Sequence, residues 1–216
     1  PDPAFLTHQT LLELLVSEVP SVSNLHTCTD GHPEISQWNG VECTPDNQVR
    51  KIDWTAAFSG GSINLQWLPS SLESLKLHEN MLVGTVNTAQ LPRELKEVVL
   101  SVNLLKGDFD FSKLPPNIRS VDIHQNHFDG TLPIESLPRP LRKMNCIANA
   151  FTGTLDLTQL PQFLLSLNLS QNKFFGPIDL SNLPPLLEQL DIHSNHCTGT
   201  LNFRQIPNTL RYIDLQ

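Results

Sequence analysis

Residues 118–140 read IRSVDIHQNHFDGTLPIESLPRP, and the same pattern recurs every 23 residues through most of the 216-residue chain. Glycine keeps this spacing from Gly61 to Gly199, and asparagine keeps it from Asn80 to Asn195. The prolines of Leu-Pro or Ile-Pro pairs also keep it, at Pro69, Pro92, Pro115, Pro138, Pro161, Pro184 and Pro207. Three residue types that share one period identify an internal repeat, which decides how the rest of the sequence is interpreted.

Aligned on this period, each unit reads L-x-x-L-x-L-x-x-N-x-L/F-x-G-x-L/V-x-L/F-x-x-L-P. Seven units begin at Val49, Leu72, Leu95, Ile118, Leu141, Leu164 and Leu187. An eighth begins at Leu210 and runs to Gln216. A single unit is too short to bury its own apolar side chains, whereas stacked units share a continuous core.

This pattern resembles the leucine-rich repeat (LRR) family over residues 49–216. The resemblance implies an α/β, β-rich fold, a right-handed solenoid or horseshoe whose concave side carries one short parallel strand per repeat. The alternation of Leu75, Lys76 and Leu77 is typical of such a strand with one buried face. Proline after the last Leu of each unit disfavours a helix interior, so few helices are expected on the convex side.

The asparagine column is expected to be structural. An asparagine side chain carries an acceptor oxygen and two donor hydrogens, so it can satisfy backbone groups where the chain leaves each strand. The predicted ladder consists of Asn80, Asn103, Asn126, Asn149, Asn172 and Asn195. In the first repeat Ala57 replaces the asparagine, which indicates a transitional unit next to a cap.

Residues 1–48 do not follow the repeat and are predicted to form an N-terminal cap, with residues 49–216 forming the solenoid. The run Thr10-Leu11-Leu12-Glu13 is typical of a capping box and predicts a helix from Gln9 to Glu18. Pro1 to Phe5 are interpreted as an expression-vector remnant, and no signal peptide is expected.

The run Trp38-Asn39-Gly40-Val41-Glu42-Cys43 resembles the N-terminal cap of plant LRR receptors and polygalacturonase inhibitors. That resemblance implies a disulfide between Cys28 and Cys43, and with it a secreted or cell-surface protein. The spacing of the two cysteines alone is equally compatible with free thiols. The motif from Gly153 to Pro161 is similar to the 23-residue repeats in surface and LRR proteins of trypanosomatid protozoa. The shorter motif from Gly130 to Pro133 also resembles repeats of plant receptors.

Cys146 and Cys197 occupy apolar positions of the repeat and are expected to be structural thiols. They lie two repeats apart, about 10 Å, which is beyond disulfide reach. At the C-terminus, Leu210, Ile213 and Leu215 are expected on an open face. This open face predicts that the chain continues in a longer protein, that a partner covers it, or that the chain self-associates through it.

The chain has a net charge of −8, from 14 basic and 22 acidic residues, and no Lys/Arg cluster along the sequence. This balance argues against a nucleic-acid backbone or an anionic membrane as partner. No stretch reaches the ~18 consecutive apolar residues that a membrane-spanning helix needs. We therefore expect a protein partner, no nucleic-acid binding and no membrane insertion.

The outward strand positions form columns across the concave face. The central column is Asp53, Lys76, Val99, Asp122, Asn145, Asn168, Asp191 and Asp214, and it is polar and mildly acidic. The densest group of functional side chains lies at the C-terminal end, where Asp191 and Asp214 are expected about 5 Å apart. The candidate partner-binding residues are Asp191, His193, Tyr212, Asp214, Asp122, His124, Lys76 and His78.

The same face argues against a metal and against catalysis. His78 and His124 are two repeats apart, about 10 Å along the sheet, whereas donors to zinc lie about 3–4 Å from one another. An open groove offers no pocket that excludes water and no oxyanion donors. We expect no metal, no cofactor and no enzymatic activity. The run Asn168-Leu169-Ser170 matches a glycosylation sequon but lies within a predicted strand, so it is interpreted as a chance occurrence.

The predicted function is therefore a protein–protein interaction module of a secreted or cell-surface LRR protein. A receptor ectodomain for a small ligand or glycan is one alternative, although the concave face has almost no aromatic residues for stacking on sugars. An enzyme-inhibitor module is another, although it needs a cationic groove that the predicted face lacks.

Overall fold

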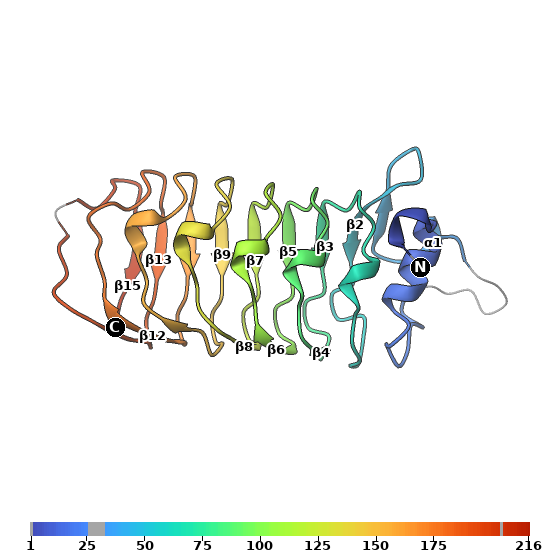
Figure 1. Cartoon of the computed structure of the whole chain (residues 1–216), viewed down its shortest axis with the longest axis horizontal. Coiled ribbons are helices and arrows are strands. Elements are labelled where there is room, and N and C mark those ends of the chain that lie inside the picture. Colours follow the sequence, from blue (N-terminus) through green and yellow to red (C-terminus); the bar gives the residue numbers. More distant parts are fainter. Residues whose placement is uncertain (1, 26–32, 204) are drawn as a thin grey trace.

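Each 23-residue unit forms one turn of an elongated solenoid, and the turns stack along the long axis of the molecule with the cap at one end (Figure 1). The computed structural model describes residues 2–25, 33–203 and 205–216. No helix in these described ranges combines the length and the apolar content that crossing a membrane requires.

A nine-stranded sheet runs the length of the solenoid. Its first strand, β1 (Val41–Cys43), belongs to the cap and pairs antiparallel with the second, β2 (Val49–Asp53). The remaining strands pair in parallel and in the order β3 (Ser74–Lys76), β5 (Glu97–Val99), β7 (Ser120–Asp122), β9 (Lys143–Asn145), β11 (Ser166–Asn168), β13 (Gln189–Asp191) and β15 (Tyr212–Asp214). Every partner lies 23 residues away, as Lys51 and Ser74 do. The predicted solenoid with a parallel sheet and few helices is confirmed.

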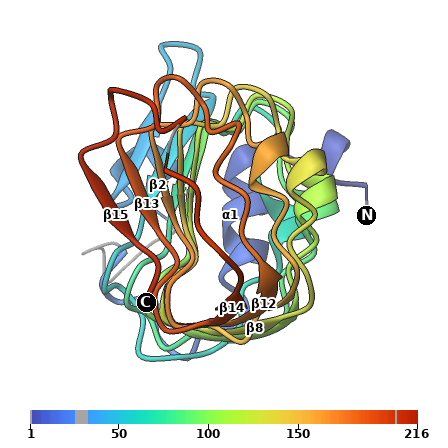
Figure 2. The ribbon, with the colours of Figure 1, turned by 90° about the vertical axis from the view of Figure 1, so that its left-hand side faces the viewer.

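Short 3-10 helices line the side opposite this sheet (Figure 2). They are η3 (Leu65–Trp67), η4 (Thr88–Gln90), η5 (Phe111–Lys113), η6 (Ile134–Ser136) and η7 (Leu157–Gln159). Asn or Asp caps most of them: the Asp110 side chain, for example, accepts a hydrogen bond from the Ser112 amide at 2.9 Å. The proline that follows each of these 3-10 helices prevents the helix from continuing.

A second set of strands follows the asparagines, and the sequence analysis did not predict it. One parallel sheet consists of β4 (Val83–Gly84), β6 (Leu104–Asp108) and β8 (His127–Asp129). Another consists of β10 (Thr152–Gly153), β12 (Lys173–Pro177) and β14 (His196–Thr198). These segments are extended because their apolar side chains alternate with exposed ones, as in the buried Phe128 between exposed His127 and Asp129.

The described part of the cap contains η1 (Pro3–Phe5), the α-helix α1 (His8–Leu15) and η2 (Ile35–Gln37). The helix begins one residue before the predicted start at Gln9 and ends three residues before the predicted end at Glu18. Thr7, rather than Thr10, is the N-cap, because its side chain accepts a hydrogen bond from the Thr10 amide at 3.2 Å. After the helix, the hydroxyl of Ser17 donates to the Leu14 carbonyl at 2.8 Å. This side-chain bond competes with the backbone hydrogen bonds that would continue the helix toward Glu18.

Gly40 brings the cap into contact with the first repeat. Its carbonyl accepts a hydrogen bond from the Asp53 amide at 2.8 Å, and its φ is +77°. A Cβ at this position would lie 2.0 Å from the Asp53 carbonyl oxygen, so no other residue fits without displacing the strand. One hydrophobic core extends from Leu12 in the cap to Ile192. The division of the chain at residue 48 stays a prediction.

The asparagines bridge neighbouring turns inside this core. In each case the side-chain oxygen accepts from an amide 21 residues earlier, or 22 for Asn80, and the side-chain nitrogen donates to a carbonyl 26 residues earlier. For Asn126 these groups are the Leu105 amide at 3.1 Å and the Leu100 carbonyl at 3.0 Å. The same paired bonds recur at Asn80, Asn103, Asn149, Asn172 and Asn195.

The cysteines of the repeats lie in or beside the core. Cys146 is fully buried, and burial raises the pKa of its thiol well above the ordinary value. Cys197 is half-buried, and burial raises its pKa as well. Among the described residues no disulfide is formed, and Cys28, the predicted partner of Cys43, lies outside them. The Cys28–Cys43 disulfide stays a prediction.

Candidate functional site

The outward-pointing side of the nine-stranded sheet, which we call the sheet face, carries the candidate residues. The register of the parallel strands places Asp122 beside Asn145, Asn145 beside Asn168, and Asn168 beside Asp191. Asp191 in turn lies beside Asp214. The central column is therefore continuous across the repeats.

In the N-terminal half of the sheet face, two lysines form ion pairs with glutamates. Lys76 Nζ lies 3.3 Å from Glu97 Oε2, and Lys51 Nζ lies 2.8 Å from Glu42 Oε1. The hydroxyl of Ser74 also donates to Glu97, at 2.8 Å. These pairs compensate two lysines and two glutamates, whereas Asp53 accepts hydrogen bonds from Thr55.

The histidines in the middle of the sheet face are closer together than the sequence analysis predicted. The ring centroids of His78 and His124 lie 6.0 Å apart, because the two side chains lean toward each other across Ser101. His78 Nδ1 lies 2.9 Å from Ser101 Oγ, and His124 Nδ1 lies 2.6 Å from Asp122 Oδ1. The predicted separation of about 10 Å is the distance between the two strand backbones, whereas the side chains extend toward each other and reduce the distance between the rings.

At the C-terminal end, Asn168, Asp191, His193, Tyr212 and Asp214 form one hydrogen-bonded group, which we call the terminal cluster. Asp191 is only 7% exposed, and its two oxygens lie 2.7 Å from His193 Nδ1 and 3.1 Å from Asn168 Nδ2. Asp214 Oδ2 lies 4.0 Å from the same histidine nitrogen and accepts from the Tyr212 hydroxyl at 3.4 Å.

The acidic neighbours act on Tyr212, which is 48% exposed. Desolvation, together with the charges of Asp191 and Asp214, raises the pKa of its phenol. The hydroxyl therefore stays protonated at neutral pH and remains a hydrogen-bond donor. The terminal cluster thus combines the nearly buried carboxylate of Asp191 with the partly exposed carboxylate of Asp214 and the exposed ring of Tyr212.

Asp191, His193 and Asp214 also offer one donor atom each within 4.8 Å of one another, so they could coordinate a metal ion. The spacing of the histidines did not predict this group, because it combines two aspartates of the central column with a histidine two residues after one of them. Coordination through Nδ1 would require His193 to give up its bond to Asp191.

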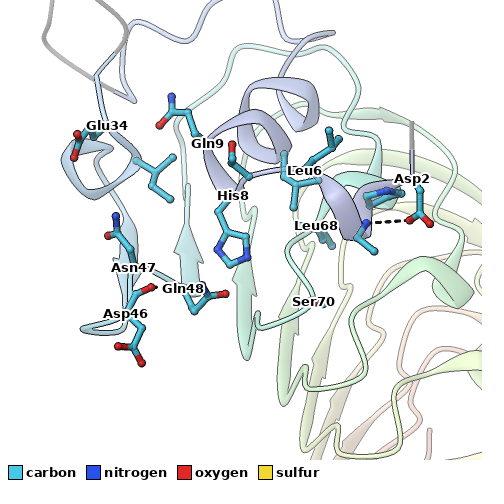
Figure 3. Close-up of a pocket in the computed structure, with 15 residues that line it drawn as sticks. Asp2, Leu6, His8, Gln9, Glu34, Asp46, Asn47, Gln48, Leu68 and Ser70 are labelled. Carbon is cyan, nitrogen blue, oxygen red and sulfur yellow. Dashed lines mark hydrogen bonds between the residues drawn. The ribbon is translucent and has the colours of Figure 1, made fainter.

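A cavity of about 1020 Å³ lies between the cap and the first repeat (Figure 3). Several of the polar groups that line it already have structural partners. Asp2 accepts from the Ala4 amide at 3.0 Å, and His8 Nδ1 accepts from the Val49 amide at 3.0 Å. We therefore assign this cavity to the junction of cap and solenoid rather than to a binding site.

No protein-family model and no curated protein sequence matches the chain. Among solved structures, a pollen receptor kinase 3 shares 28% identity with a TM-score of 0.75, over 91% of this chain and 99% of that one. A BIR3–SERK2 complex from Arabidopsis thaliana shares 21% identity (TM-score 0.60; 88% and 94% covered). The LRR ectodomain of GASSHO1/SCHENGEN3 from Arabidopsis thaliana, in complex with CASPARIAN STRIP INTEGRITY FACTOR 2, shares 20% (TM-score 0.57; 94% and 31% covered). The likeness to trypanosomatid repeats stays a prediction.

Proposed function

Because the chain is a leucine-rich repeat protein, we propose that it is a binding module that recognises a protein partner through the terminal cluster. The similar structures that contain a BIR3–SERK2 complex and a bound CASPARIAN STRIP INTEGRITY FACTOR 2 support a protein as the partner. The proposal assigns no catalytic role to the sheet face.

The observation that carries the proposal is the uneven distribution of charge partners. Glu97 pairs with Lys76, whereas within the described ranges no lysine or arginine pairs with Asp191 or Asp214. Two carboxylates held in adjacent strands repel each other, and a cationic group of a partner relieves that repulsion. Tyr212 supplies an exposed ring of the kind that is enriched in interface hot spots.

A secreted or cell-surface location belongs to the same proposal. It is supported by the similarity in fold to an LRR ectodomain and by the cap run from Trp38 to Cys43. The alternative of a glycan ligand finds less support, because Tyr212 is the sole Phe, Tyr or Trp among the outward-pointing strand residues of the sheet face.

The test compares partner capture by three forms of the intact chain. The Asp191→Ser, Asp214→Ser variant removes both carboxylates of the terminal cluster. The control, Asp108→Ser with Asp129→Ser, removes two exposed aspartates that are paired in register on β6 and β8. We expect the wild type and the control to retain one protein partner from the native source, and the cluster variant to lose it. Added salt should weaken the wild-type complex. Equal capture by all three forms would place the binding surface elsewhere.

A further inference from the structure

Three arginines that are separated in sequence meet at one edge of the solenoid. Arg119 directly precedes β7, Arg142 directly precedes β9, and Arg139 lies in the turn before Arg142. Together with Pro140 and Phe163 they line a pocket of about 210 Å³. The sequence showed no Lys/Arg cluster because these residues are spread over positions 119–142 and come together only through the stacking of repeats.

The position of Arg119 and Arg142 in adjacent repeats is fixed by the backbone. The Arg142 amide donates to the Arg119 carbonyl at 2.8 Å, so the two side chains start about one strand spacing, ~4.8 Å, apart. The position one repeat further is Leu165, and one repeat earlier it is Lys96. No acidic residue therefore lies beside either arginine in this column.

Elsewhere in the same column, two cationic side chains are paired with a carboxylate. Near the N-terminus, Glu73 lies between Arg50 and Lys96 and forms an ion pair with each at 2.8 Å. These two cations hold the pKa of Glu73 below its usual range. In contrast, the guanidinium groups of Arg119 and Arg142 form no ion pair or hydrogen bond with any described residue.

The third wall of the pocket is apolar. Phe163 is 56% exposed, although five other phenylalanines of the repeats are fully buried. Phe163 and Pro140 line the pocket together with the three arginines. Arginine forks bind tetrahedral oxyanions with paired hydrogen bonds, and an exposed ring next to them offers a contact for the organic part of a ligand.

We propose that this pocket, the arginine pocket, binds the phosphate or sulfate ester group of a ligand whose apolar part packs on Phe163. The oxyanion offsets the repulsion between Arg119 and Arg142, as the carboxylate of Glu73 compensates the charges of Arg50 and Lys96. Arg139 closes the pocket from the turn. This site is separate from the terminal cluster, so each can fail without the other.

The experiment is a calorimetric titration of the intact chain at low salt with phenyl phosphate, phenyl sulfate and inorganic phosphate. We expect saturable binding of at least one phenyl ester at a single site. Arg142→Gln should weaken this binding about tenfold or more, the loss of one charge-assisted hydrogen bond. Phe163→Ala should weaken the phenyl esters and leave inorganic phosphate unchanged. Tighter binding of phenyl phosphate identifies a phosphorylated ligand, and tighter binding of phenyl sulfate a sulfated one.

The matched control is Arg93→Gln, which removes the same charge from the turn position that Arg139 occupies two repeats later. It should bind the phenyl esters as the wild type does. If no ester saturates the protein, or if Arg93→Gln weakens binding as much as Arg142→Gln, the arginine pocket is not a binding site. If Phe163→Ala leaves the esters unaffected, the packing of the ligand on the ring is wrong.

Discussion

The side-chain oxygen of Asn126 accepts a hydrogen bond from the backbone amide of Leu105, which lies 21 residues earlier in the chain, at 3.1 Å. The same side chain donates to the Leu100 carbonyl at 3.0 Å. One side chain thus satisfies two buried backbone groups of the preceding turn. Without it, both groups would remain buried and unpaired.

We therefore expect Asn126→Ala to lower the free energy of unfolding by about 1–3 kcal/mol. Asn117→Ala is the matched control, because Asn117 is exposed in the turn before the same strand, β7. Urea unfolding of the two variants measures the difference. Equal unfolding midpoints would show that the ladder contributes nothing to stability.

Val102 is held in a left-handed backbone conformation, with φ of +57°. This region is costly for a β-branched residue and is tolerated best by Asn and Gly. We expect Val102→Asn to raise the free energy of unfolding by about 1 kcal/mol, since the strain disappears. The control is Gln125→Asn at the equivalent position (φ of +52°), where an unbranched side chain leaves less strain to remove. If Val102→Asn raises the free energy of unfolding no more than Gln125→Asn does, Val102 stores no more strain than Gln125 and the account is wrong.

His8 predicts a dependence of stability on pH. Burial lowers its pKa in the folded protein, and its Nδ1 accepts from the Val49 amide. The unfolded chain therefore takes up the proton first, and stability is lost as the pH falls below the unfolded value of about 6.5. Stability is fully present above that value.

We expect His8→Gln to show a smaller drop in melting temperature between pH 7.5 and pH 5.5 than the wild type. Both proteins contain the same carboxylates, so the difference between the two curves isolates His8. Parallel curves would mean that His8 is protonated equally in both states.

The predicted disulfide of the cap is tested by alkylation of the denatured protein without reductant. If Cys28 and Cys43 are bonded, the reagent labels only Cys146 and Cys197, and reductant raises the number to four. Intact-mass analysis counts the labels. Four labels without reductant, in protein from a eukaryotic secretory host, would contradict both the disulfide and the extracellular location.

The repeat period alone predicts which side chains share a column, because the register between strands equals the period. Asp191 and Asp214 were placed side by side on this basis, and the strands pair them. The period does not predict how far a side chain leans out of its column, as the rings of His78 and His124 show. That distance depends on rotamers, which the sequence pattern does not contain.

The helix start and the arginine pocket were missed for two other reasons. Thr7 and Thr10 both match the residue preference of an N-cap, and only the backbone geometry distinguishes them. Arg119 and Arg139 look unrelated along the chain, because one precedes a strand and the other lies in the turn at the end of the same repeat. In an alignment of the repeats, Arg119 and Arg142 occupy the same column, which places them in adjacent turns.

Every junction between repeats has the same register. The distance between two surfaces on this molecule can therefore change only in whole steps of one strand spacing. The arginine pocket ends at Phe163 and the terminal cluster begins at Asn168. A duplicate of residues 141–163 inserted before Leu164 would move the two surfaces apart by one strand spacing, about 4.8 Å, and would leave the composition of the terminal cluster unchanged. A ligand that spans both surfaces could thus be selected by its length alone, through duplication or loss of whole units.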